Sequence, residues 1–149
     1  MTIRTEEIVL DTNVWIFGLH RTPAYPACAQ LLDRLGELSV VIPRQILREL
    51  QAHLSEEELR AFFAVANRHP QQIRVDWQRV PVELIRKYQA LGCKRGDAVV
   101  AAHVEHLGVS VLVSENRELL TGVSGLPFRV LTASATLTEL EEANQPEGA

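Results

Sequence analysis

Short apolar runs alternate along the chain with segments whose apolar residues recur every three or four positions. The runs Ile8-Val9-Leu10 and Val109–Val113 have the length and the composition of buried strands. Between them, Ile46, Leu50 and Leu54 have the spacing of one face of a helix. Strands that alternate with helices predict a mainly parallel sheet covered by helices on both faces, so we expect an α/β fold.

Prolines, glycines and capping residues divide this pattern into elements. We expect strands at 8–10, 38–42, 73–75, 109–113 and 128–131, of which 73–75 is a short edge strand. We expect helices from 12, at 27–35, at 43–54, from 55 to about 69, at 81–91, 96–107 and 116–120, and from about 133 to 142. No repeat or linker separates them. The sequence therefore predicts one domain, residues 1–140, and a flexible C-terminal tail, residues 141–149.

Charge and length narrow the functional classes. The chain has 149 residues and a formal net charge of -4, which excludes broad, sequence-independent coating of nucleic acid. A nuclease is still allowed, because an acidic metal site adds negative charge of its own. The polar N-terminus does not resemble a signal peptide, and no apolar run approaches the roughly 18 residues needed to span a bilayer. We expect a cytoplasmic protein.

Cysteine, histidine and tryptophan give weaker signals. Cys28 and Cys93 lie far apart without CxxC spacing, which favours reduced thiols over a disulfide or a zinc site. His103 and His106 have no third ligand at zinc spacing, and we expect both at the surface or at its boundary. Trp15 and Trp77 are expected to pack in the core or in an interface rather than to stack on bases.

Three acids occupy positions that suit chemistry. Asp11 follows the first strand, and ligands in open α/β sheets bind at the carboxyl ends of strands. Glu49 lies at the margin of the apolar stripe of its helix, and Asp97 shares a helix face with Ala101 and Val104. Each acid also has a purely structural interpretation: Asp11 as an N-cap, Glu49 as the surface partner of an arginine, Asp97 as a charge that favours the helix dipole.

Polar residues after the strand 109–113 extend this set. Ser114 or Asn116 could cap the next helix, and Glu115 or Asn116 could add a metal ligand or hold a bound water. Asn13 could fix the turn after Asp11 or orient that acid. Clustered carboxylates repel one another unless a cation neutralises them, and oxygen ligands suit Mg²⁺ or Mn²⁺. Because such an ion stabilises charge on phosphate and activates water, phosphodiester hydrolysis is the favoured chemistry.

At these residues the chain resembles the PIN domain, the nuclease fold of many bacterial VapC-like toxins. The resemblance covers roughly residues 7 to 140 and four short motifs in the family's order: Val9-Leu10-Asp11-Thr12-Asn13-Val14, Ile46-Leu47-Arg48-Glu49-Leu50, Gly96-Asp97-Ala98-Val99-Val100-Ala101-Ala102 and Val111-Leu112-Val113-Ser114-Glu115-Asn116. It implies a three-layer α/β/α sandwich with a central parallel sheet, and cleavage of RNA that depends on Mg²⁺ or Mn²⁺. It also implies a small antitoxin partner and a homodimer.

Carried over by residue, the resemblance makes Asp11, Glu49 and Asp97 the acidic metal ligands, with Asn13 and Ser114 as supporting polar groups. The fourth motif departs from the family. Many members have an aspartate two places after its Ser or Thr, whereas this chain has the neutral Asn116 there, preceded by Glu115. Asn116 takes that catalytic position, and Glu115 is an alternative metal ligand.

Three hypotheses follow. The leading one is a metal-dependent endoribonuclease, the toxin of a toxin–antitoxin pair, with RNA phosphates bound by the basic residues that flank the acidic motifs: Arg44, Arg48, Lys94 and Arg95. Each of these could equally be a solvated surface charge. The second, motivated by Asn116, is a weak or inactive PIN-fold module that binds RNA or protein. The third, a phosphohydrolase with Asp11 as nucleophile in the manner of haloacid-dehalogenase-like enzymes, normally requires an aspartate where this chain has Asn13.

Overall fold

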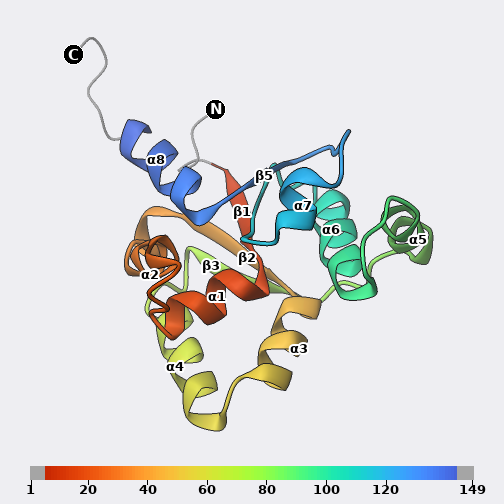
Figure 1. Ribbon diagram of the computed structural model, residues 1–149. Helices are drawn as coiled ribbons and strands as arrows, with labels where there is room; N and C mark the ends of the chain where they lie inside the picture. Colours follow the sequence, from red (N-terminus) through yellow and green to blue (C-terminus); the bar gives the residue numbers. More distant parts are fainter. Residues whose placement is uncertain (1–5, 144–149) are drawn as a thin grey trace.

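The structure is a computed structural model that describes residues 6–143 (Figure 1). Its five strands form one sheet in the order β3-β2-β1-β4-β5, and every neighbouring pair is parallel. The strands are β1 (Glu7–Leu10), β2 (Ser39–Pro43), β3 (Ile73–Asp76), β4 (Val111–Val113) and β5 (Arg129–Leu131). The first strand thus lies in the middle of the sheet, between β2 and β4.

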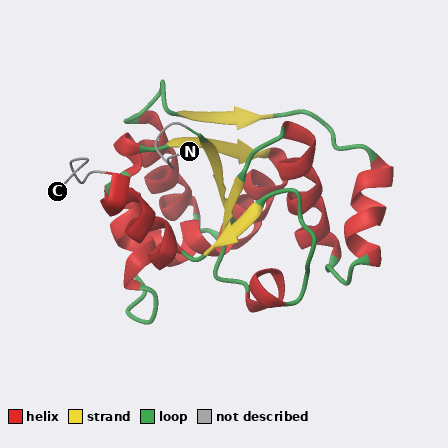
Figure 2. Cartoon of the chain, turned by 90° about the horizontal axis from the view of Figure 1, so that it is seen from above, coloured by secondary structure: helices red, strands yellow, loops and turns green. Residues whose placement is uncertain are grey.

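Helices lie on both sides of the strands, as Figure 2 shows from above, so the predicted three-layer α/β/α architecture is confirmed. On one side α1 and α2 pack together and α8 packs against α2 and β5, whereas on the other α6 packs against β2 and β4 and carries α5. Within residues 6–143 the helices are α1 (Thr12–Leu19), α2 (Pro26–Asp33), α3 (Arg44–His53), α4 (Glu56–Asn67), α5 (Val82–Ala90), α6 (Arg95–Leu107), α7 (Arg117–Thr121) and α8 (Ala133–Ala143), with a 3-10 turn at Leu35–Glu37.

Burial explains why the central strands are apolar without alternation. All residues of β4, and Ile8, Val9 and Leu10 of β1, are buried, because helices cover both faces of the sheet. The strand β3 differs: Ile73 and Asp76 at its ends are buried, Arg74 is exposed and Val75 is half-buried, and the strand lies at the edge of the sheet, as the sequence predicted. None of the described helices is both long and apolar enough to cross a membrane.

Small side chains bring α6 close to the sheet. Ala98, Ala101 and Ala102 are fully buried on this helix, and Gly108 ends it in the left-handed conformation at φ 69°. The helix α3, which follows β2 directly, packs against both α1 and α6 at the carboxyl ends of the strands. This bridging helix sets the geometry of the site described below.

The predicted elements are all present, with small shifts in their ends. The helix α2 begins one residue earlier than expected, at Pro26, and gives way to the 3-10 turn before the expected end. The strand β4 is shorter than predicted, since Val109 and Ser110 precede it. The helix α8 continues through Ala143, so the first three residues of the predicted tail are helical, and residues 144–149 lie outside the described part.

The structure corrects two expectations about single residues. Trp15 is buried and packs edge-on against Phe62, as predicted, whereas Trp77 is 64% exposed because it directly follows the edge strand β3. Trp77 is therefore not a core residue, and its packing in an interface stays a prediction. His103, expected near the surface, is only 1% exposed. Its burial is possible because its Nε2 lies 2.9 Å from Oδ1 of Asp76, which is itself buried at the end of β3.

Asp76 links the edge strand to α6 and to the next loop. Besides His103, it accepts a hydrogen bond from the backbone N–H of Gln78 at 3.0 Å, and Arg74 lies 3.4 Å away. Burial acts to raise the pKa of Asp76, but the hydrogen bonds from His103 and Gln78 and the nearby charges outweigh it and hold the pKa below its usual value.

We predict that Asp76→Ala lowers the free energy of unfolding by about 3 kcal/mol or more, because His103 and Gln78 then lose a buried partner. Urea unfolding at neutral pH measures the loss. Folding lowers the pKa of Asp76, so its stabilising contribution is present above the unfolded pKa and is lost as the pH falls. The free energies of unfolding of the wild-type protein and of Asp76→Ala should therefore become similar in acid.

The matched control is Asp33→Ala, which removes an exposed acid paired with Arg21 and should cost less than about 1 kcal/mol. Equal effects of the two substitutions would show that the Asp76 contacts do not stabilise the fold.

Candidate metal centre

Asp11 stands at the junction of β1 and α1. Its backbone N–H donates to the carbonyl of Val113 at 2.8 Å, which extends the pairing of β1 with β4 by one residue. Its Oδ1 accepts from the N–H of Thr12 at 2.8 Å, so Asp11 is the N-cap of α1. Its Oδ2 accepts from the Ser114 hydroxyl at 2.7 Å, and the side chain is only 4% exposed. The capping role is therefore confirmed, and it fixes the direction of the carboxylate.

Glu49 reaches the same place from α3. One carboxylate oxygen accepts from the hydroxyl of Thr12, and the other accepts from Nε2 of Gln45 at 3.1 Å. A Cβ atom on Gly96 would lie 3.1 Å from Oε1 of Glu49, so the missing side chain lets the start of α6 approach this acid. No described arginine forms an ion pair with Glu49, so its predicted alternative role as a surface ion-pair partner has no support here.

Asp97 lies in the first turn of α6, half-buried. Its Oδ2 accepts a hydrogen bond from the Asn116 amide at 3.1 Å. Asn116 in turn is the N-cap of α7, where its Oδ1 accepts from the N–H of Glu118 at 3.0 Å. The neutral residue of the fourth motif thus contacts the third acid directly, and both of its side-chain functions are used.

Ser114, fully buried, connects these groups. Besides donating to Asp11, its hydroxyl accepts from the backbone N–H of Asn116 at 3.0 Å and lies 3.4 Å from Nδ2 of Asn13. The Oδ1 of Asn13 accepts from the N–H of Glu115 at 3.2 Å. The predicted supporting residues therefore tie the loop after β4 to the start of α1.

The carboxylate of Glu115 points elsewhere. Its Oε1 accepts from the N–H of Ala133, at the start of α8, at 2.9 Å, and the Cys28 thiol lies 4.0 Å away. The first N–H groups of a helix lack partners within the helix and favour a negative charge, which explains this arrangement. The structure thus brings together Asp11, Glu49, Asp97, Asn13, Ser114 and Asn116 and leaves Glu115 outside this network.

Negative charge accumulates between these elements. Burial raises the pKa of Asp11 to about 6, and the charges of Asp97 and Glu49 add to the rise although Ser114 and Thr12 donate hydrogen bonds to the carboxylate. Burial also raises the pKa of Asp97, against the hydrogen bond from Asn116 and with help from the charges of Glu49 and Glu118. We call Asp11, Glu49 and Asp97 the acidic cluster.

The acids of this cluster do not converge on one point. Among the described residues, no three Asp, Glu, His or Cys side chains are close enough to hold a metal ion together. Each acid is instead turned toward its own donor, Ser114, Thr12 or Asn116. The cluster nevertheless fits Mg²⁺ or Mn²⁺ in chemistry, because all its donors are oxygens, its charges repel, and Mg²⁺ commonly takes one or two carboxylates and retains several waters.

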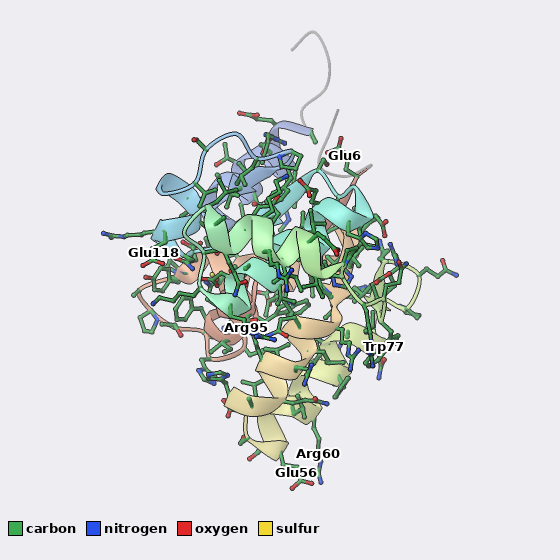
Figure 3. The ribbon with its side chains drawn as sticks, turned by 90° about the vertical axis from the view of Figure 1, so that its right-hand side faces the viewer. Glu6, Glu56, Arg60, Trp77, Arg95 and Glu118 are labelled. Carbon is green, nitrogen blue, oxygen red and sulfur yellow. The ribbon has the colours of Figure 1, made fainter. Side chains whose placement is uncertain are left out.

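A basic groove of about 660 Å³ begins at Glu49. Three of the four arginines and lysines predicted to meet RNA line it, namely Arg44, Arg48 and Arg95. Lys94 instead lines a separate cavity of about 430 Å³ that contains Asp97 and Glu118. In Figure 3, Arg95 faces the viewer between Glu118 and Trp77.

Sequence reasoning missed Thr12, Gln45 and Arg79. Thr12 and Gln45 hold Glu49, and Arg79 lines the groove from the loop after β3. Gln45 precedes Glu49 by four residues on a helix, a spacing that brings side chains together and could have revealed it. Arg79 had no such local signal.

Solved structures share the fold at low sequence identity. VapBC2 from Rickettsia felis, in a structure bound to a promoter DNA fragment, is 15% identical with a TM-score of 0.60, and FitAcB from Neisseria gonorrhoeae is 15% identical with a TM-score of 0.59. Each match covers 85% of this chain and 98% of the other. PAE2754 from Pyrobaculum aerophilum is 16% identical with a TM-score of 0.53, covering 93% of this chain and 98% of its own.

No curated protein matches the chain. The family model of the PIN domain, by contrast, matches residues 8–122, which include the whole acidic cluster, the strands β2, β3 and β4, and all of β1 except its first residue. The chain therefore belongs to the PIN domain family.

Proposed function

We propose that this PIN domain is a metal-dependent endoribonuclease and the toxin of a toxin–antitoxin pair. The observation that supports it best is the acidic cluster: three carboxylates, one directly after β1 and one each on α3 and α6, are linked through hydrogen bonds from Thr12, Ser114 and Asn116. Two further observations agree, the basic groove beside Glu49 and the likeness to the toxin–antitoxin structures VapBC2 and FitAcB.

Asp11, Glu49 and Asp97 would hold the cation, and the surrounding residues fix their positions. Ser114 and the Thr12 N–H orient Asp11, Thr12 and Gln45 orient Glu49, and Asn116 orients Asp97. A bound Mg²⁺ or Mn²⁺ supplies charge stabilisation for the scissile phosphate and lowers the pKa of a coordinated water. Asn13 holds the loop after β4 in place by accepting a hydrogen bond from it. Asn116, at the last position of the fourth motif, is a neutral polar group that donates to Asp97.

The basic residues beside the cluster serve the RNA backbone in this proposal. Arg44, Arg48 and Arg95 in the groove, and Lys94 on the other side of Asp97, would contact phosphates rather than bases. Such contacts position a strand without selecting its sequence, so the RNA target has to be set elsewhere on the protein.

The proposed partners are a small antitoxin and a second copy of this chain. The support for the antitoxin is the likeness to VapBC2 and FitAcB, and to FitAB bound to a DNA fragment at 17% identity. A homodimer is proposed only because PIN toxins resemble one another in this respect.

A second candidate function is a PIN-fold module that binds RNA or protein with weak catalysis or none. Asn116 favours it, since a neutral amide contacts Asp97 where many family members have a carboxylate. The cleavage experiment below separates the two candidates.

We predict that the pure protein cleaves single-stranded or structured RNA with Mg²⁺ or Mn²⁺, not with EDTA, and that Asp97→Asn slows cleavage at least about 100-fold because a charged ligand is lost. Gel assays on a mixed RNA panel measure it. The control Glu56→Gln removes an exposed acid of α4 that pairs with Arg60 and does not line the groove, and it should leave cleavage unchanged.

Absence of metal-dependent cleavage in the folded wild-type protein, together with RNA binding that Asp97→Asn does not alter, would favour the binding module. Cleavage that Asp97→Asn leaves intact would remove Asp97 from the proposed site.

We predict that Asn116→Asp raises the affinity for Mn²⁺ about tenfold, because a fourth carboxylate joins the cluster while an aspartate can still cap α7. Isothermal titration with Mn²⁺ measures the change, and cleavage should increase with it. If the affinity for Mn²⁺ stays the same, residue 116 does not contribute to cation binding.

We predict that the free energy of unfolding of the metal-free wild-type protein falls by about 2–3 kcal/mol, relative to that of Asp11→Asn, as the pH rises from about 4 to about 7. The folded pKa of Asp11, about 6, lies above its unfolded value of about 4, so its contribution is complete below the unfolded pKa and is lost as the pH rises through 6. Urea unfolding in EDTA at several pH values measures the difference.

Adding Mn²⁺ at pH 7 should restore stability to the wild-type protein and less to Asp11→Asn, since the cation offsets the charge that burial penalises. A stability difference between the two proteins that does not vary with pH would contradict the assigned burial and repulsion.

A further inference from the structure

An exposed indole stands at the far side of the basic groove. Trp77, 64% exposed, directly precedes Gln78, Arg79 and Val80, and these three residues line the groove. Figure 3 shows Trp77 at the margin of this face, on the opposite side of Arg95 from Glu118. A tryptophan offers a large, rigid aromatic face, and bases of single-stranded nucleic acid stack on such faces.

The backbone on both sides of Trp77 is held in place. Asp76 before it is buried and bonded to His103, and Gln78 after it donates to Asp76 through its backbone N–H at 3.0 Å. The amide of Gln78 also lies 3.4 Å from Oδ2 of Asp76. The loop therefore presents the indole from a fixed position, which lowers the entropy cost of ordering it on a ligand.

The groove itself is strongly basic in an acidic protein. Four arginines line it, Arg44, Arg48, Arg79 and Arg95, and Glu49 is its one acidic lining residue. Within residues 6–143 none of the four forms a salt bridge, whereas other arginines, such as Arg34 and Arg74, are paired with carboxylates. Their guanidinium groups are thus available for phosphates.

We propose that the groove holds a single-stranded arm of the RNA substrate, with the arginines on its phosphates and a base stacked on Trp77. The assignment to RNA rests on the proposed function. The strand would run from the acidic cluster at Glu49, past Arg95, to the loop at Arg79. We propose a single strand because a base must expose its face to stack on an aromatic ring, and bases inside a duplex do not expose theirs.

An acidic peptide is the other ligand that four arginines could attract. The combination of a basic groove and an aromatic ring beside it favours a nucleic-acid strand, because stacking on aromatic rings and phosphate contacts together are how single strands are commonly bound. The peptide is therefore treated as an alternative outcome of the test.

The test uses a fluorescein-labelled single-stranded RNA of about 12 nucleotides and the same RNA annealed to its complement. The protein carries Asp97→Asn to prevent cleavage, a residue that does not line the groove. Fluorescence anisotropy gives the affinity. Trp77 emission gives the contact itself, because Trp15, the other tryptophan, is fully buried.

We expect the single strand to quench Trp77 emission and to protect it from iodide. Trp77→Ala should weaken binding about tenfold, and Trp77→Phe should retain most of the affinity. Arg79→Ala should weaken binding and reduce the slope of affinity against salt by about one. The controls are Phe63→Ala and Arg60→Ala, an exposed aromatic and an exposed arginine of α4 outside the groove, and neither should change binding.

Unchanged affinity in Trp77→Ala, or equal quenching by the duplex, would overturn the proposal. Unchanged RNA affinity combined with an altered oligomeric state of Trp77→Ala in size-exclusion chromatography would assign the ring to a protein contact instead. Cleavage by the wild-type protein, with the same KM in Trp77→Ala, would leave the nuclease proposal standing and remove this one. Quenching by the single strand, without any cleavage by the wild-type protein, would support the RNA-binding groove and count against the nuclease proposal.

Discussion

The carboxylate of Asp11 is the constraint around which the centre of this protein is arranged. It is a buried carboxylate at the end of the middle strand, and burial by itself disfavours its ionised form. It persists because it receives two hydrogen bonds, one from the N–H of Thr12 and one from Ser114. The first bond makes Asp11 the N-cap of α1, and the second ties the loop after β4 to the end of β1.

Glu49 and Asp97 extend that arrangement to the other layer of helices. The helix α3 contacts both α1 and α6, and Gly96 offers no side chain to keep α6 away from Glu49. Three carboxylates are thereby held close enough to repel one another, which lowers the stability of the folded protein. Proteins commonly accept such costs where a ligand or a reaction requires them. Uncharged donors orient the three acids, and no described lysine or arginine forms a salt bridge with them, although the charge of Lys94 acts to lower the pKa of Asp97.

The sequence allowed the fold and most of the candidate site to be predicted because those signals are local. The apolar run of β1, the short strand β3 and the motif around Asp97 each lie within a few residues, and the alternation of strands and helices predicted the parallel sheet but not the order of its strands. The partner of His103 was missed because Asp76 reaches α6 only through the folded edge of the sheet. The exposure of Trp77 was missed because it depends on the position of this residue beyond the end of the edge strand. The same holds for Arg79, whose neighbours in the groove come from α3 and α6. The direction of the Glu115 carboxylate depends on the start of α8 lying beside the loop after β4, a tertiary contact that spacing in the sequence does not reveal.

That direction has a structural consequence. Successive residues after β4 face opposite sides: Ser114 and Asn116 meet the acids, whereas Glu115 between them bonds to the first N–H of α8. The helix α8 lies outside residues 8–122, the region matched by the family model, yet it is joined by this bond to the tripeptide that orients Asp11 and Asp97. The C-terminal helix therefore contributes one of the hydrogen bonds that hold the loop supporting both acids, although it lies outside the matched region.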